Sequence, residues 1–560
     1  MNSLRLACVL TFAGLVATAC SSESSEEGPG DFLSVLQTAP QDGTDQAPTA
    51  ARIGFQIDAA IDPATLTSAN FFVTDENGAP LTGTPTVLDD DSSAAELILD
   101  APMEVITTYR ATITTGLRST GGVALEENFE WTFTTLDSAW GISEWIEEDV
   151  NGTSAEQDIA VDAQSNAIAV WEHETAAGTA IWANRYTRTD LWGEPVPIDR
   201  GSGTVARPSV ATDDAGNGIA VWERINEGGV AANIWTNRYD VAAGTWGTAE
   251  LLQSGEITQA EQASVAAAPS GDAVATWVQT DADTGRDVVW ARTYSAGSGW
   301  GEAGLISEGI PESFLAGNST LGMDGAGNAI AVWSRRTVDG DVIWANRYVP
   351  TGGWGEAAII KSDPATSARR VRLSVGDAGD AFVVWIQGDG QRDDVWSTRF
   401  SGTWGEPGRI DAYDAANKRD VDVAVDGAGV AHAVWSQEDP DFVNIWANRY
   451  TLASGWEEPQ LIEPPNEDPL EDADATLPRA GVNAAGNAFV VWLQTSNGWR
   501  SVWSNRRDPE SDWLGAELIE DIERPAKAAI VVVDDERHAH ALWLHFVDQG
   551  FDWVRTNRFE

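Results

Sequence analysis

Short apolar runs separated by polar turns fill most of the chain, and they predict β-strands. In the segment from Asp324 to Tyr348, "AIAVW" is apolar at consecutive positions, which is typical of a strand covered on both faces. The turn "DGAGN" precedes this strand, and "VIWANRY" follows it as a second strand. The pattern predicts four-stranded units such as "PSVAT", "GIAVWER", "NIWTNRY" and "WGTAELL", between residues 208 and 252.

Tryptophans mark the recurrence of this unit, in three series with spacings of 50 to 57 residues. The first series ends the "AVW" strand at Trp171, Trp222, Trp277, Trp333, Trp385, Trp435, Trp492 and Trp543. The second is Trp182, Trp235, Trp290, Trp344, Trp396, Trp446, Trp503 and Trp553. The third is Trp140, Trp192, Trp246, Trp300, Trp354, Trp404, Trp456 and Trp513. Eight such repeats predict an eight-bladed β-propeller of four-stranded blades over residues 137–560.

The two ends of the repeat region predict how the ring closes. The region opens with an isolated fourth strand, "WGISEWIEE" from Trp140, and finishes with a third strand, "WVRTNRFE" from Trp553. Residues 140–148 are therefore expected to complete the last blade. Such closure removes the exposed strand edges of an open array.

The repeated residues are assigned structural roles first. The tryptophans are expected to fill the space between blades. An arginine of the "NRY" pattern is expected to stack on a neighbouring tryptophan or to pair with a loop carboxylate. It occurs at Arg185, Arg238, Arg347, Arg399, Arg449, Arg506 and Arg558. The alternative is a lectin-like propeller with one Arg/Trp sugar site in each blade crevice.

Residues 31–136 show a different pattern, with alternating short strands and turn signals. "APQDG" at Ala39, "IDPATLTSANFFV" at Ile61, "YRATITTGL" at Tyr109 and "WTFTT" at Trp131 resemble the bacterial Ig-like domain of the S-layer type. The resemblance implies a β-sandwich that serves as a stalk, and it carries over no catalytic residues. The expected chain is therefore all-β, an Ig-like β-sandwich followed by the propeller.

The first residues form a targeting segment. Residues 1–19 combine a basic end with the short apolar run "LACVLTFAGLVATA", and the "ATAC" stretch ending at Cys20 resembles the lipobox of bacterial lipoproteins. That resemblance implies lipid attachment at Cys20, with the acidic tether of residues 20–30 behind it. Ser21 after the cysteine favours the outer membrane, on its periplasmic face or the cell surface. The alternative is an ordinary secretory signal.

The charge balance limits the partners. The chain has 34 basic and 87 acidic residues and a formal net charge of −53, so nucleic acid would be repelled. This acidity serves either solubility, which a saline habitat would favour, or an acidic binding surface. A monomer is expected.

Cofactor chemistry has little support in the sequence. Asp281, Asp283 and Asp287 alternate as in a calcium loop, but Gly285 is misplaced for an EF-hand and Arg292 stands where its glutamate would be. The five histidines suggest no complete ligand set, since His538 and His540 lack an evident third partner. No metal site is therefore assigned, with calcium at the three aspartates as the weak candidate.

Function is expected where the repeats differ. The connections after the second and fourth strands vary, and both fall on the same face of a propeller, which predicts the binding surface. Trp499 and Arg500 in "TSNGWRS" are the candidate ligand contacts, because an aromatic beside an arginine is typical of binding hot spots. The leading hypothesis is an envelope lipoprotein, with a role such as adhesion, whose propeller binds a glycan or protein ligand on an Ig-like stalk. The alternatives are a non-catalytic scaffold of an outer-membrane complex and, third, a carbohydrate-cleaving enzyme.

Overall fold

The computed structural model has an all-β architecture with two compact units, Met1–Ile142 with Phe559–Glu560 and Ser143–Arg558. It describes residues 32–47, 53–75, 78–88, 92–99, 103, 107–135, 140–147, 152–176, 178–199, 201, 203–225, 232–253, 259–307, 314–337, 340–361, 366–388, 390–412, 416–438, 442–463, 474–496, 498–509, 511–520, 522, 524–547 and 550–559. The signal, Cys20 and the tether lie outside these residues. Within the described ranges no helix is long and apolar enough to cross a membrane.

The Ig-like domain is a sandwich of two four-stranded sheets. One sheet has the order β1-β3-β6-β5, with β1 (Val35–Ala39), β3 (Ile53–Ile57), β6 (Ala94–Leu99) and β5 (Gly83–Val87). The other has the order β2-β8-β7-β4, with β2 (Thr44–Ala47), β8 (Phe129–Thr135), β7 (Thr108–Ile113) and β4 (Phe71–Thr74). Phe55, Phe71, Tyr109 and Trp131 are buried between them. The predicted sandwich is confirmed.

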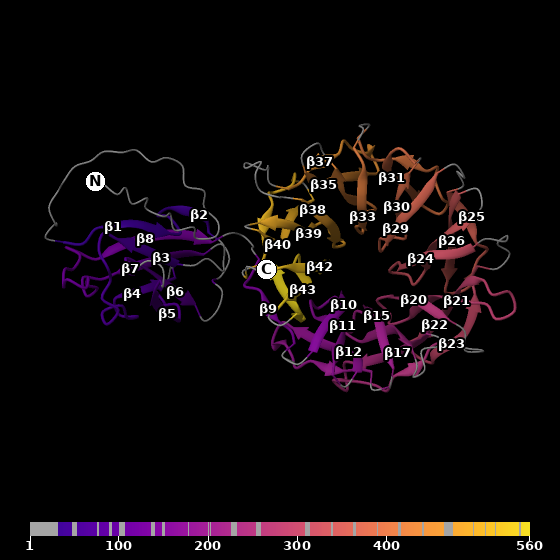
Figure 1. The fold of residues 1–560 in the computed structure, drawn as a ribbon, viewed down its shortest axis with the longest axis horizontal. Coiled ribbons are helices and arrows are strands. Elements are labelled where there is room, and N and C mark those ends of the chain that lie inside the picture. Colours follow the sequence, from indigo (N-terminus) through magenta and orange to yellow (C-terminus); the bar gives the residue numbers. More distant parts are fainter. Residues whose placement is uncertain are drawn as a thin grey trace. The chain divides into compact units, whose positions relative to one another are not determined.

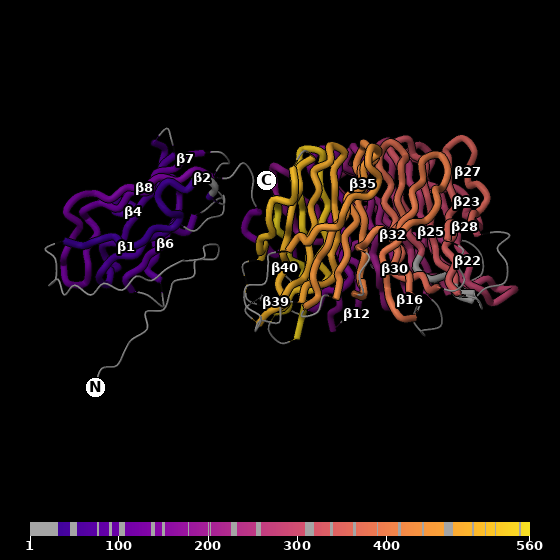
Figure 2. Tube along the Cα trace, turned by 90° about the horizontal axis from the view of Figure 1, so that it is seen from above, coloured from indigo at the N-terminus to yellow at the C-terminus, as the bar shows by residue number. Residues whose placement is uncertain are grey.

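The propeller forms a ring of eight antiparallel sheets, and its strands run between the two faces of the ring (Figures 1 and 2). The first, innermost strands are β10 (Gly152–Val161), β15 (Thr204–Thr212), β20 (Ala260–Ala267), β24 (Phe314–Met323), β29 (Ser367–Val375), β33 (Lys418–Val425), β38 (Ala475–Val482) and β42 (Ala526–Val533). The second strands are β11 (Ala167–Thr175), β16 (Gly218–Ile225), β21 (Ala273–Thr280), β25 (Ala329–Thr337), β30 (Ala381–Gly388), β34 (Ala431–Glu438), β39 (Ala488–Ser496) and β43 (Ala539–Phe546).

The outer half of each blade completes the sheet. The third strands are β12 (Gly178–Thr187), β17 (Ala232–Asp240), β22 (Asp287–Ser295), β26 (Gly340–Val349), β31 (Asp393–Phe400), β35 (Val443–Thr451), β40 (Trp499–Arg507) and β44 (Asp552–Phe559). The outermost strands are short: β9 (Glu144–Trp145), β13 (Leu191–Trp192), β14 (Val196–Pro197), β18 (Thr245–Trp246), β19 (Glu250–Leu251), β23 (Gly299–Leu305), β27 (Gly353–Trp354), β28 (Ala358–Lys361), β32 (Gly408–Arg409), β36 (Gly455–Trp456), β37 (Gln460–Leu461) and β41 (Glu517–Leu518). The eight-bladed prediction is confirmed.

Tryptophans of the second strands fill the space between blades, as predicted. Each of the eight is fully buried. Trp385 of blade 5 packs with Val332 and Ile343 of blade 4, and Trp435 packs with Val384 and Val395 in the same way. Each blade therefore presents its tryptophan to the preceding blade.

The last blade has the strand order β42-β43-β44-β9, so a segment from before the first blade completes it. Arg555 pairs with Trp145, and Trp140 forms an isolated bridge with Phe559. This register shows that Trp553 does not occupy the position of the other tryptophans in the second series. In the other blades, the third-strand residue that pairs with this position of the outermost strand is a tryptophan, as in Trp235↔Leu251. In the last blade it is Arg555, and Trp553 lies two residues earlier.

Several "NRY" arginines stack on a tyrosine or phenylalanine of the next blade rather than on tryptophan, which corrects the expectation. Arg185 lies 5.6 Å from the ring centroid of Tyr239 in the next blade, and Arg558 lies 4.7 Å from that of Tyr186. The pairing with carboxylates is present as well, for example between Arg399 and Asp380 at 2.6 Å. These arginines therefore join neighbouring blades.

Turns between first and second strands lock the blades together on one face, which we call the turn face. Asp162 accepts hydrogen bonds from the backbone amides of Gln164 and Asn166. Gly216 of the next blade has φ +85°, and a Cβ there would lie 2.7 Å from Asp162 Oδ2. The turn therefore requires glycine at this position, both for its left-handed backbone and for its close contact with Asp162. The opposite side is the loop face.

Candidate ligand-binding site in the central channel

The innermost strands surround the propeller axis, and each carries a β-bulge where its pairing with the second strand shifts (Figure 1). In six bulges a non-glycine residue has φ between 45° and 58°. These residues are Glu156, Arg207, Gln262, Arg370, Leu477 and Ala528. A left-handed backbone costs a non-glycine residue about 1–3 kcal/mol, and such positions concentrate at functional sites. The bulges therefore mark the channel as the candidate site.

Side chains of the preceding blade hold several of these bulges in place. Glu156 Oε2 accepts the amide of Arg207 at 2.7 Å, and Glu223 Oε1 accepts the amide of Gln262 at 2.6 Å. Gln262 in turn accepts the amide of Ser319 through its Oε1 at 3.3 Å. The strained backbone is thus fixed by the ring itself before any ligand arrives.

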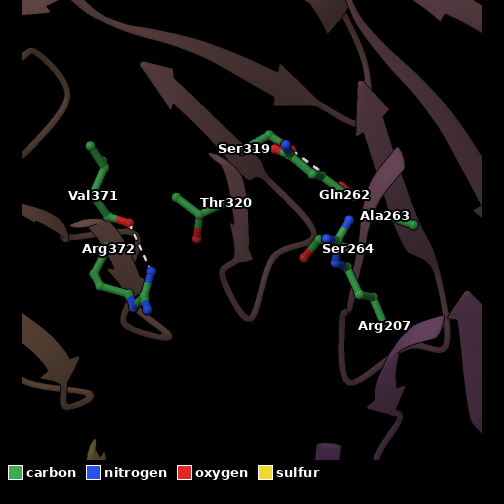
Figure 3. A pocket seen from close by; sticks show the side chains of 8 residues that line it. All are labelled: Arg207, Gln262, Ala263, Ser264, Ser319, Thr320, Val371 and Arg372. Atoms are coloured by element: carbon green, nitrogen blue, oxygen red, sulfur yellow. Dashed lines mark hydrogen bonds between the residues drawn. The ribbon is translucent and has the colours of Figure 1, made fainter. Parts of the chain in front are cut away.

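A cavity of about 450 Å³ opens beside the bulges of blades 2 to 5. Figure 3 shows Arg207 and Arg372 on opposite sides of it, with hydroxyl groups between them. Its lining residues are Arg207, Gln262, Ala263, Ser264, Ser319, Thr320, Val371 and Arg372. The lining has no aromatic ring to stack on a ligand. It offers guanidinium, amide and hydroxyl groups, which suit a ligand rich in oxygen.

The innermost strands depart from the acidic character of the chain. Basic residues outnumber acidic ones on the innermost strands, whereas the whole chain has a formal net charge of −53. The basic residues are Arg207, Arg369, Arg370, Arg372, Lys418, Arg419, Arg479 and Lys527. The acidic residues are Glu156, Asp158, Glu261, Asp420 and Asp422. β29 alone contributes three arginines and no carboxylate.

Charges within the wall are partly paired. Arg207 lies 3.2 Å from Glu223, which raises the pKa of the Arg207 guanidinium. Arg370 lies 3.3 Å from Asp420. Arg372 has a longer contact with Asp422, 3.9 Å, and burial lowers the pKa of this guanidinium.

Blade 1 holds two carboxyl groups with raised pKa values, Asp158 on the innermost strand β10 and Glu172 on the second strand β11. Burial, followed by the charges of Glu156 and Glu174, raises the pKa of the Glu172 carboxyl to about 7. Burial raises the pKa of Asp158 to about 6, against the hydrogen bond from the Val210 amide. Both carboxyl groups therefore hold a proton closer to neutral pH than ordinary carboxyl groups do.

The sequence-predicted contacts Trp499 and Arg500 lie outside the cavity. Trp499 is the first residue of β40 on the loop face, paired with Ser496, rather than part of a loop as expected. Its exposed fraction is 42%. Arg500 donates to the Thr476 hydroxyl at 2.8 Å. This pair forms a separate candidate contact.

A smaller cavity of about 320 Å³ lies on the loop face of blade 5. Arg369, Asp393 and Asn417 are among its lining residues, and Arg369 pairs with Asp393. This cavity lies at one of the variable connections that the sequence pointed to. Several other such connections lie outside the described residues.

Two of the weak calcium candidates take part in a hairpin. Asp281 Oδ1 accepts the Thr284 amide and hydroxyl, at 2.8 and 2.6 Å, which lowers the pKa of Asp281. Asp287 accepts the Thr280 hydroxyl at 2.9 Å. In the described part of the chain, no group of three His, Cys, Asp or Glu side chains is placed to hold a metal ion.

The candidate site in the channel was not predicted, because the variable loops were expected to form the binding surface. The available signal was compositional: "SARRVR" in β29 places three arginines on one first strand of a strongly acidic chain. The bulges themselves have no sequence mark, since their left-handed residues are chemically unrelated.

A comparison with curated proteins finds no match to the chain. A protein of unknown function from Dyadobacter fermentans is 9% identical, with a TM-score of 0.39, covering 76% of this chain and 99% of that one. A polysaccharide lyase is 11% identical, with a TM-score of 0.40 and coverage of 61% and 87%. The β-propeller domain of the trilobed protease from Pyrococcus furiosus is 9% identical, with a TM-score of 0.39 and coverage of 66% and 96%. Residues 31–135 match the bacterial Ig-like domain family, in agreement with the sandwich that they form.

Proposed function

We propose that this protein is a cell-envelope lipoprotein whose propeller binds a glycan or protein ligand in its central channel. The observation that carries the proposal is the polar cavity beside the ring of bulges, lined by Arg207, Arg372 and hydroxyl side chains. Strained backbone and convergent polar groups around a cavity are typical of ligand sites. A lining of guanidinium, amide and hydroxyl groups favours the glycan as the ligand, because these groups pair with sugar hydroxyl groups.

Presentation at the envelope is the second part of the proposal. Cys20 carries the lipid, the acidic tether of residues 20–30 follows, and the S-layer-type Ig-like domain acts as the stalk. The outer membrane is the proposed location and a monomer the proposed state. A non-catalytic scaffold would use the same anchor, but it would have no need of a polar cavity in the channel.

A bulky side chain placed in the cavity tests the proposal. Ser264→Phe places a ring among the lining residues, and Ser270→Phe places one on an exposed turn of the same blade as a control. On a glycan array, the parent and the Ser270 variant should bind the same glycans, and the Ser264 variant should lose them. Unchanged binding by Ser264→Phe, together with loss in Trp499→Ala, would move the site to the loop face.

A second candidate function is glycan cleavage, which the state of Glu172 favours. A glutamic acid with a pKa of about 7 holds a proton for a leaving group near neutral pH, and the neighbouring Glu156 supplies a second carboxylate. Incubation of array-positive glycans with the protein tests this candidate. New reducing ends that disappear in Glu172→Gln would support cleavage, and intact glycans would leave the protein a binder.

A further inference from the structure

We infer that the channel wall formed by blades 5 to 7 binds the anionic group, a carboxylate or a sulfate, of an acidic glycan. The inference rests on the proposed function and names the ligand class. It is carried by the arginines of β29 and β38, the innermost strands of the blades on either side of blade 6, because the β29 arginines contact carboxylates of blade 6 and Arg479 acts electrostatically on Arg372. The site comprises Arg370, Arg372 and Arg479, with Asp420 and Asp422 between them.

The two carboxylates of blade 6 only partly neutralise the three arginines. Asp420 pairs with Arg370 at 3.3 Å. Asp422 Oδ1 lies 3.9 Å from Arg372, while its Oδ2 accepts the Ala480 amide at 3.1 Å. One carboxylate is therefore divided between a backbone amide and a distant guanidinium.

Arg479 has a weaker set of partners still. Its guanidinium donates to the carbonyl oxygen of the adjacent Pro478 at 2.9 Å. Within the described residues, no carboxylate lies at ion-pair distance from it. Burial lowers the pKa of Arg372 and the charge of Asp422 raises it, while the charges of Arg479 and Arg370 lower it further, so the guanidinium groups lie close enough to repel one another. An anion between them would relieve this repulsion and accept several charged hydrogen bonds.

The cavity brings this wall within reach of a saccharide. Arg372 lines the cavity together with Thr320, Ser319 and Ser264. A carboxylate or sulfate at the arginines would thus sit beside hydroxyl donors and acceptors for the sugar ring that carries it. The guanidinium fork suits planar carboxylates and sulfate oxygens alike.

The acidity of the remaining surface does not prevent this binding. At physiological salt, charges farther away than about 8 Å are largely screened, so the local arginines decide the potential inside the channel. The same acidity disfavours long polyanions such as nucleic acid along the outer surface. The expected ligand is therefore a glycan in which the charged group enters the channel.

The experiment measures binding of three probes by calorimetry: an oligogalacturonate, its carboxyl-reduced neutral counterpart and a sulfated oligosaccharide. The parent should bind at least one acidic probe about tenfold or more tightly than the neutral one. This preference should weaken between about 0.15 M and about 0.5 M salt. Preference for the carboxylate or the sulfate probe identifies which anion the wall accepts.

Substitutions locate the effect. Arg372→Gln and Arg479→Gln should each lower affinity for the acidic probe about tenfold or more, and leave the neutral probe unchanged. Arg110→Gln, which removes an exposed arginine of the Ig-like domain, is the matched control. Asp422→Asn should strengthen acidic-probe binding severalfold while keeping an acceptor for the Ala480 amide. Misfolding cannot increase affinity for the acidic probe. The Asp422 variant therefore remains informative even if an arginine variant loses stability.

Equal binding of neutral and acidic probes would overturn the inference and leave the proposed glycan function standing. Failure of every glycan, on the array and in calorimetry, would overturn both. Acidic binding that survives Arg372→Gln and Arg479→Gln, or that does not respond to Asp422→Asn, would place the anion site elsewhere.

Discussion

Closure of the ring depends on Ile146, which follows the closing strand β9. Its exposed fraction is 2%, and it packs with Trp171 of the first blade and with Leu542 and Val554 of the last. Its carbonyl accepts the Asn184 side chain at 2.9 Å. Ile146 thus contacts both of the blades that meet where the ring closes.

Ile146→Ala should lower the unfolding free energy of the propeller by about 2–5 kcal/mol, because it leaves a cavity in a fully packed core. Ile142→Ala is the matched control: the same substitution four residues earlier removes a side chain with an exposed fraction of 60% and should cost less than about 0.5 kcal/mol. Ile306→Ala, at the equivalent position of an interior blade with 3% exposure, should match Ile146→Ala.

Denaturant unfolding followed by tryptophan fluorescence measures the effect, since nearly all tryptophans belong to the propeller repeats. If Ile146→Ala and Ile142→Ala shift the midpoint equally little, β9 does not hold the ring closed. If Ile306→Ala destabilises the propeller while Ile146→Ala does not, the closing blade unfolds independently of the others.

Three further predictions concern the anchor, the loop face and pH. Cys20→Ser should yield unlipidated protein that leaves the detergent phase in a phase separation, and unchanged partition would refute the lipobox. Trp499→Ala should leave the melting temperature nearly unchanged, because the ring is 42% exposed, and a loss of about 2 kcal/mol in ligand binding would mark it as a contact. Glu172 has a folded pKa of about 7 against an ordinary 4.5, so its ionisation destabilises the fold as pH rises through that window. Glu172→Gln should therefore raise stability by on the order of 1–3 kcal/mol at a pH of about 8 and have little effect at a pH of about 4, and equal effects at both would contradict the assignment.

The repeat architecture could be predicted because the residues that build it are chemically costly to replace. A fully buried tryptophan such as Trp385 and a turn glycine such as Gly216 return at the same place in successive blades. The single misassigned tryptophan has a physical reason. Trp553 and Arg555 are two residues apart on one strand and so share a face, which lets the aromatic shift along the strand without changing sides.

The stacking partner of the "NRY" arginines could not be read from the sequence, since tyrosine and tryptophan recur at equal intervals. That Arg185 reaches Tyr239 of the next blade depends on how the two blades pack, which the sequence of one blade does not state. The bulges were equally hidden, because a bulge depends on pairing between two strands. Arg207 and Leu477 adopt the same left-handed backbone without any shared side-chain chemistry.

The proposed site lies where the repeats differ, but in another element than the variable loops that the sequence pointed to. The second strands barely vary, because each must bury a tryptophan against its neighbour. The innermost strands share only the bulge, and their side chains vary from the carboxylates of β10 to the arginines of β29. Eightfold repetition thus fixes the geometry of the channel, while the unequal charges of its strands give that channel a basic side and an acidic side. A ligand with one charged end would bind such a wall in a single orientation, which a symmetric ring could not impose.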